Sequence, residues 1–153
     1  MGGVCEVMVL GLPTGVGEPF FDSIESTLSK FYFSVPGIKG VEFGDGFHIT
    51  QLFGSEANDE MFVEENEISE LRNIKFKSNH SGGINGGISN GMPIIARVAV
   101  RPTPSIKKQQ NSVNCETLKN EKISIEGRHD RGIILRIASV IESVTAMGIL
   151  DLL

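Results

Sequence analysis

The stretch Asn79–Gly91 constrains this chain most, because it reads NHSGGINGGISNG and holds five glycines in thirteen residues. Neither a packed helix nor a strand favours that composition, since glycine loses more backbone freedom on folding than any other residue. Glycine makes up 18 of the 153 residues, about 12% against a typical ~7%. We therefore predict a loop at 79–91 whose backbone lies against a flat or anionic ligand. A flexible surface connection is the alternative.

Apolar patterning predicts both strands and helices around this loop. Strands bounded by turn residues are expected at 4–12, 38–43, 47–53, 92–100 and 122–125. Helical spacing of apolar residues predicts one helix at 19–33, opened by Pro19, and another from about residue 133 to the end. Strands and helices do not alternate regularly, so we expect an α+β fold with an antiparallel sheet packed on two long helices.

The length of 153 residues suffices for one hydrophobic core. We therefore predict a single domain over 1–153. Two polar segments, 56–78 and 107–120, are expected to be surface excursions.

Charge and cysteine usage exclude several classes of protein. The 14 Lys and Arg against 19 Asp and Glu give a net charge of −5, which is not the basic footprint of a nucleic-acid binder. No apolar run approaches the ~20 residues of a membrane-spanning helix. Cys5 and Cys115 form no CxxC motif, and His48, His80 and His129 lack metal-ligand spacing. We predict a cytoplasmic protein with reduced thiols, no metal, and no nucleic-acid or membrane partner.

The segment Arg101–Ser105, RPTPS, follows directly after the predicted strand 92–100. It places one guanidinium and two hydroxyls within five residues, on a backbone restricted by Pro102 and Pro104. A fixed positive charge with several short donors is what a phosphate group requires. The same residues also occur in plain loops, so both interpretations stay open here.

A third candidate, Gly127-Arg128-His129-Asp130, precedes the C-terminal predicted helix, and anions are favoured at a helix start. Arg128 could hold an anionic substrate, and Asp130 could accept a proton beside that cation. The alternative is a helix-capping aspartate with a surface arginine.

Six blocks, in order, resemble the C-terminal part of the chorismate synthase family. They are GLPTGVGEPFFDSIES (11–26), PGIKGVEFGDGF (36–47), GSEANDEM (54–61), NHSGGINGGISNGMPI (79–94), RPTPSI (101–106) and GRHD with IASVIES (127–130 and 137–143). The resemblance implies half of the family's β-α-β sandwich.

It also implies a lyase, a flavoprotein that converts 5-enolpyruvylshikimate 3-phosphate to chorismate by anti-1,4 elimination of phosphate. This is the last step of the shikimate pathway, in aromatic amino-acid biosynthesis. The family requires reduced FMN, although the reaction involves no net redox change. The resemblance also implies an association with NADP and a cytoplasmic homotetramer.

The resemblance assigns roles to ten residues. FMN would be held by the backbone at Pro36 and Gly37, by Gly86 in the glycine loop, by Arg128, and at its phosphate end by Arg101, Pro102, Thr103, Pro104 and Ser105. Arg128 would also contact the substrate. Asp130 would be catalytic and manage a proton at the flavin N5.

Three departures from the family pattern affect these expectations. Arg101 stands where the family has lysine, and Arg131-Gly132 stands where Pro-Cys usually follows. The family's N-terminal part, with two catalytic histidines and most of the substrate-binding arginines, has no counterpart here. We therefore expect a truncated, inactive half with weak or no FMN binding. The alternative is a non-catalytic folding and oligomerisation module.

Overall fold

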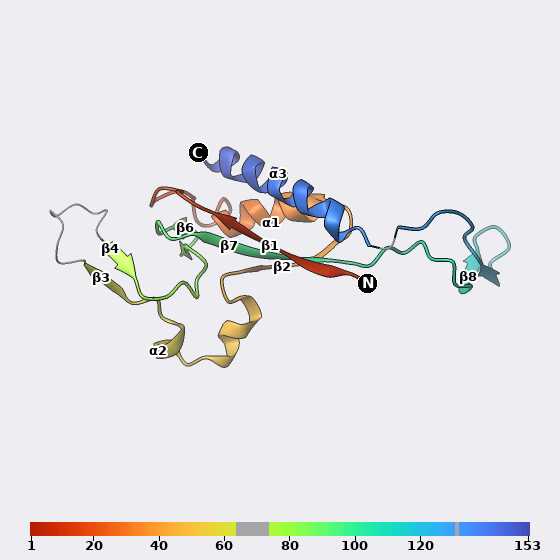
Figure 1. Cartoon of the computed structure of the whole chain (residues 1–153), viewed down its shortest axis with the longest axis horizontal. Coiled ribbons are helices and arrows are strands. Elements are labelled where there is room, and N and C mark those ends of the chain that lie inside the picture. The colour runs from red at the N-terminus through yellow and green to blue at the C-terminus, as the bar shows by residue number, and fades with distance from the viewer. Residues whose placement is uncertain (64–73, 131) are drawn as a thin grey trace.

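A three-stranded antiparallel sheet with two helices on one face forms the centre of the protein (Figure 1). The computed structural model describes residues 1–63, 74–130 and 132–153. The helices are α1 (Ile24–Ser34), the 3-10 helix η1 (Gly46–Gln51), α2 (Gly54–Ala57) and α3 (Ile134–Leu152). The strands are β1 (Gly3–Val9), β2 (Ile38–Phe43), β3 (Met61–Val63), β4 (Ile74–Phe76), β5 (Ile84–Asn85), β6 (Ile88–Ser89), β7 (Ile94–Val100), β8 (Gln110–Asn114) and β9 (Lys119–Ile123).

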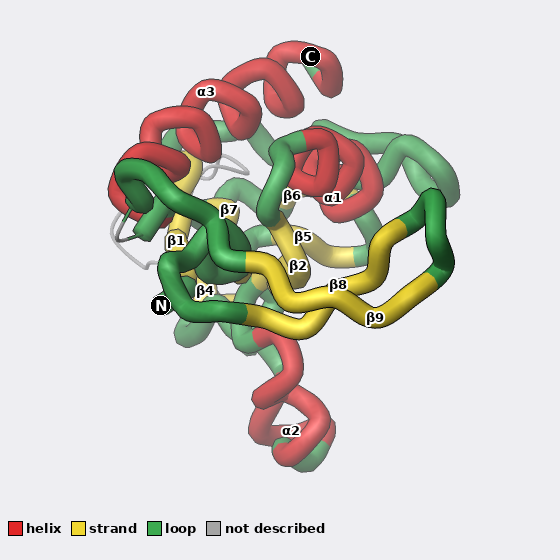
Figure 2. The backbone as a smooth tube through the Cα atoms, turned by 90° about the vertical axis from the view of Figure 1, so that its right-hand side faces the viewer, coloured by secondary structure: helices red, strands yellow, loops and turns green. Residues whose placement is uncertain are grey.

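The central strand is β7, and the sheet order is β1-β7-β2. Every second residue of β7 is buried, which is the period expected of a strand with one face in the core. Val98 lies opposite Cys5 of β1 and Val41 of β2, so one face of all three strands is apolar. Figure 2 shows α1 and α3 side by side on that face.

The helix α1 begins at Ile24, five residues later than the sequence predicts. Ser23 supplies the N-cap, because its Oγ accepts a hydrogen bond from the Ser26 N–H at 3.1 Å. Phe20, expected on the buried face, precedes the helix and is 89% exposed. A polar cap therefore determined the helix start more strongly than Pro19 did.

The two helices contact each other through small and polar residues as well as aliphatic ones. The Tyr32 hydroxyl of α1 and Thr145 Oγ1 of α3 are 3.0 Å apart, and both residues are buried. Gly148 allows α3 to approach α1, because a Cβ there would lie 2.8 Å from Leu28 Cδ2. The predicted apolar face of the C-terminal helix is confirmed at Ile137 and Ile141.

The strand predicted at 47–53 is wrong, since these residues form η1 and the turn before α2. Local hydrogen bonds satisfy this segment, including Thr50 Oγ1 to Phe47 O at 2.8 Å and Phe53 N to Glu56 Oε2 at 2.8 Å. Phe47 and Phe53 are exposed, so no sheet is present against which an extended conformation would bury their side chains.

Two hairpins extend from opposite ends of the sheet (Figure 1). The polar segment 56–78 contributes the hairpin β3–β4, and its residues 64–73 lie outside the described residues. The segment 107–120, expected to be flexible, contains β8 and the start of β9. The strand predicted at 122–125 is β9, which begins three residues earlier.

The fold class predicted from the sequence, α+β with an antiparallel sheet on two helices, is confirmed. In the part of the chain that the structure describes, no helix has the length and apolar character needed to span a membrane.

Candidate functional site

One end of the central sheet, where β7 finishes and β2 begins, gathers several of the predicted FMN residues. The Arg101 N–H donates to the Gly37 carbonyl at 2.9 Å, which continues the pairing of the two strands by one bond. Gly37 has a φ of +100°, and a Cβ there would lie 3.3 Å from Ile133 Cδ1. Pro36 is exposed beside it. Gly37 therefore lets the chain pass close to the Ile133 side chain just before β2 begins.

The segment Arg101–Ser105 leaves the sheet at this point and holds a buried hydroxyl without a partner. Pro102 and Pro104 are exposed, whereas Thr103 and Ser105 are half-buried. Thr103 Oγ1 is buried and has no hydrogen-bond partner. A buried polar atom left unpaired costs about 1–3 kcal/mol, so this hydroxyl points to a ligand that would satisfy it.

A side-chain hydrogen bond joins this segment to the loop before α3. Ser105 Oγ lies 3.0 Å from His129 Nδ1, across 24 residues of sequence. The other ring nitrogen, His129 Nε2, lies 3.0 Å from the Ile125 carbonyl oxygen. The fold therefore brings together two motifs that the sequence presents separately. From the sequence alone, His129 is excluded as a metal ligand and is assigned no other role.

Asp130 is oriented by an arginine that sequence reasoning did not single out. Arg136 Nη1, in the first turn of α3, lies 3.0 Å from Asp130 Oδ2. The two side chains are 70% and 39% exposed, so the ion pair is reachable from solvent. Arg128 is exposed on the same loop. The sequence signal that could have identified this ion pair is the arginine six residues after Asp130, at the start of the predicted C-terminal helix.

Gly86 is the one predicted FMN residue that the structure places elsewhere. It lies in the turn between β5 and β6, and the neighbouring Gly87 carbonyl accepts the Ile24 N–H at 3.1 Å. This is the start of α1, whereas Gly37 follows its end, and an 11-residue helix spans about 16 Å. Gly86 is exposed, and a Cβ there would meet nothing within 4 Å.

Other glycines of the loop are required by contacts within the chain itself. A Cβ at Gly82 would overlap the backbone nitrogen of Gly44. At Gly83 it would lie 2.6 Å from the Pro93 carbonyl oxygen, and at Gly87 it would lie 2.6 Å from Ser23 Cβ. The loop backbone therefore does lie close against another surface, as predicted. At these three positions, however, that surface is another part of the same chain and not a ligand.

A buried carboxylate anchors the same loop. Asp59, 8% exposed, accepts hydrogen bonds from Ser78 Oγ at 2.7 Å, His80 N at 2.8 Å and Ser81 N at 2.9 Å. Burial alone raises the pKa of Asp59, but these hydrogen bonds together lower it below its ordinary value. His80 Nδ1 is in turn 2.7 Å from Asp45 Oδ2. About twenty residues separate Asp59 from its partners, so no local pattern indicated this network.

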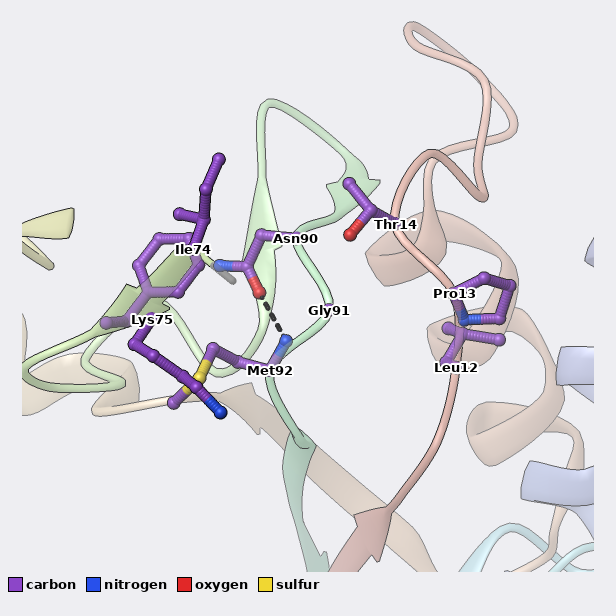
Figure 3. Close-up of a pocket in the computed structure, with 9 residues that line it drawn as sticks. Leu12, Pro13, Thr14, Ile74, Lys75, Asn90, Gly91 and Met92 are labelled. Carbon is purple, nitrogen blue, oxygen red and sulfur yellow. Dashed lines mark hydrogen bonds between the residues drawn. The ribbon is translucent and has the colours of Figure 1, made fainter. Parts of the chain in front are cut away.

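A cavity of about 690 Å³ adjoins the end of the glycine loop (Figure 3). Its walls come from the β1–α1 connection, β4 and the end of the loop, including Thr14, Lys75, Asn90 and Met92. Asn90 Oδ1 accepts the Met92 N–H at 2.9 Å, which closes the loop at this wall. None of the predicted FMN residues lines this cavity.

No group of three or more His, Cys, Asp and Glu side chains able to hold a metal occurs among residues 1–63, 74–130 and 132–153.

A family profile for chorismate synthase matches residues 1–153. The chain belongs to the chorismate synthase family. It is 46% identical over 153 residues to the chorismate synthase of Methanocaldococcus jannaschii, and 47% identical over 152 residues to that of Dehalococcoides mccartyi. These alignments cover 100% and 99% of the chain, but only 39% and 40% of the relatives.

A solved structure, described as the crystal structure of chorismate synthase, has the same fold over this part. The TM-score is 0.74 at 30% sequence identity, covering 99% of this chain and 36% of that one. The resemblance read from the six sequence blocks is therefore confirmed, and the chain spans about two fifths of the relatives' length.

Proposed function

We propose that this chain forms one wall of the FMN and substrate site of a chorismate synthase, in aromatic amino-acid biosynthesis. The reaction would be the anti-1,4 elimination of phosphate from 5-enolpyruvylshikimate 3-phosphate, giving chorismate. The observation that carries the proposal is the buried, unpartnered Thr103 Oγ1 in the segment that begins with Arg101.

The residues of this segment fit the phosphate end of FMN. Arg101 supplies a permanent positive charge, while Thr103 and Ser105 supply hydroxyls on a backbone restricted by two prolines. Gly37, whose carbonyl accepts the Arg101 N–H, places a partly exposed stretch of backbone beside this segment. Bound reduced FMN would supply reversible electron donation, which fits a reaction without net redox change.

The loop before α3 would act on the substrate side. Arg128 would bind an anionic group of the substrate, and Asp130, oriented by Arg136, would hold or release a proton beside it. Gly86 would contact FMN only where another part of the assembly brings it close, because it lies at the far end of α1. The family's homotetramer in the cytoplasm is the setting we propose for such an assembly.

A comparison of FMN with riboflavin tests the phosphate site. We expect the chain alone to bind FMN weakly and riboflavin, which lacks the phosphate, more weakly still. Arg101→Ala should abolish that difference, whereas Lys30→Ala, which removes an exposed cation of α1, should not. Equal binding of both flavins would contradict the proposal. Phosphate release when the family's N-terminal part is added in trans would test the reaction itself.

A second candidate, a folding and association module, is favoured by exposed apolar surface. Among the described strands, β1 pairs only with β7, and Val4, Met8 and Leu10 are more than half exposed along it. An apolar groove of about 470 Å³ runs between β1 and α3. Uncovered strand edges and apolar patches favour association. A ligand-free homo-oligomer in sedimentation experiments would support this function, whereas compaction that depends on FMN would support the half-site.

A further inference from the structure

His129 has one hydrogen-bond partner whose role is unambiguous. Its Nε2 lies 3.0 Å from the Ile125 carbonyl oxygen, which can only accept. Nε2 therefore carries a hydrogen. A neutral ring with its hydrogen on Nδ1 would instead set two lone pairs against each other, so only two states of His129 satisfy this contact.

These two states leave Ser105 with opposite roles. In the neutral ring, Nδ1 is an acceptor, so the Ser105 hydroxyl must donate its single hydrogen to it across 3.0 Å. In the imidazolium, Nδ1–H donates to Ser105 Oγ, and the hydroxyl hydrogen becomes free to donate elsewhere. The bond to Ile125 is retained in both states.

A phosphate at this site needs donors. With neutral His129, the only hydrogen of Ser105 is occupied, and the oxygen presents lone pairs that repel an anion. With charged His129, both Ser105 and the unpartnered Thr103 hydroxyl can donate to phosphate oxygens.

We propose that His129 takes up a proton from solvent when the phosphate end of FMN binds at Arg101–Ser105, and thereby turns Ser105 into a phosphate donor. This inference rests on the proposed function. No covalent bond changes except the new N–H, and the bound phosphate compensates the added charge. His129 is thus a positioning residue for the phosphate site.

The charged groups on the segments that meet at His129 are mostly basic. Arg101 begins the segment 101–105, Lys107 lies two residues after it, and Glu126 follows Ile125. On the loop of His129 itself, Arg128 and Asp130 flank it, and Arg136 of α3 pairs with Asp130. A bound phosphate would therefore be the principal anion near the ring when the site is occupied.

The experiment is a ¹⁵N NMR titration of the imidazole in this chain, over the range from about pH 5 to 8 in which histidine usually titrates. Without ligand we expect a neutral ring with hydrogen on Nε2 at the upper end of this range. Saturating FMN should move the titration midpoint of His129 upward, and riboflavin should leave it in place. A neutral ring with hydrogen on Nδ1 in the unliganded chain would overturn the inference independently of any flavin.

His129→Asn is the matched variant, because its amide oxygen can accept from Ser105 as Nδ1 does but cannot be protonated. FMN affinity of the unmodified chain should fall with rising pH, by at most about tenfold per pH unit, the limit for one linked proton. In H129N only the dependence due to the phosphate's own titration should remain, and it has the opposite sign, because loss of the second phosphate proton at about pH 6 favours binding. Ser105→Ala should lower affinity and remove the FMN-induced shift of His129.

The outcomes separate the two proposals. Binding of FMN that prefers the phosphate but leaves His129 unshifted overturns the proton uptake alone. Equal binding of riboflavin and FMN, or absence of FMN binding even when the family's N-terminal part is added in trans, overturns the phosphate site and the proton uptake with it. Identical pH dependence in H129N and the unmodified chain also overturns the role of His129.

Discussion

The glycine loop 79–91 and the segment 101–105 differ in how fully their polar groups are satisfied. In and around the loop, Asp59 accepts three hydrogen bonds and His80 meets Asp45. In the segment, Thr103 Oγ1 is buried without a partner, and the Ser105 hydroxyl has only a histidine ring nitrogen beside it. The loop with the more conspicuous sequence is thus internally complete, whereas the shorter segment is not.

An unusual composition therefore does not by itself indicate a ligand site, whereas unpaired polar atoms do. The glycines at 82, 83 and 87 allow contacts inside the chain, so their replacement should cost stability. In 101–105 the Thr103 hydroxyl has no hydrogen-bond partner and the Ser105 hydroxyl meets only a titratable ring, so replacement of either should cost ligand affinity instead.

Asp59→Ala should lower the free energy of unfolding by about 3 kcal/mol, because it leaves three buried donors without an acceptor. Urea denaturation followed by circular dichroism measures this. Glu60→Ala is the control, since Glu60 is an exposed carboxylate paired with Lys77 and should change stability little. Equal effects of the two variants would show that Asp59 does not anchor the loop.

Gly82→Ala and Gly86→Ala form a matched pair, because both glycines have positive φ, +63° and +60°. A Cβ at Gly82 would overlap Gly44, whereas a Cβ at Gly86 meets open space. We expect G82A to cost more than about 2 kcal/mol and G86A about 1 kcal/mol from backbone strain alone. Thermal unfolding compares them. A larger cost at Gly86 would contradict the contacts described for the loop.

Thr103→Val should stabilise the chain by about 1 kcal/mol, because it replaces an unpaired buried hydroxyl with a methyl group. The same change should weaken FMN binding about tenfold. Thr145→Val is the control, since Thr145 Oγ1 is bonded to Tyr32 and Ile141 and its loss should destabilise. Denaturant midpoints and flavin titration give both values. A destabilised T103V would mean that the hydroxyl has an internal role.

The pH dependence of stability should report Asp59. Because its pKa is lowered in the folded protein, its contribution is complete above the unfolded carboxyl pKa of about 3.9 and is lost as pH falls through the folded value. The stability difference between the unmodified chain and Asp59→Asn should therefore shrink as pH falls from about 5 to 3. Urea midpoints at several pH values check this. A difference independent of pH would contradict the assignment.

Much of the fold could be predicted from local pattern. The apolar run at 92–100, bounded by turn residues, predicted β7, and the helical spacing after residue 133 predicted α3, because both elements have a face in the core. The segment 47–53 also carries several apolar residues but has no sheet to join, so its prediction as a strand is wrong. A prediction from apolar pattern assumes that the apolar side chains are buried. Only the neighbouring elements of the fold can bury them.

The sequence by itself determined the candidate motifs, since Arg101, Thr103 and Ser105 are close along the chain and need no fold to be grouped. The tertiary structure decided which motifs meet: it joined Ser105 to His129 and Asp130 to Arg136, and it left Gly86 at the other end of α1. It also decided which polar atoms remain unpaired. Hydrogen bonds between distant segments depend on where the sheet and helices place their ends, and no local pattern encodes those positions.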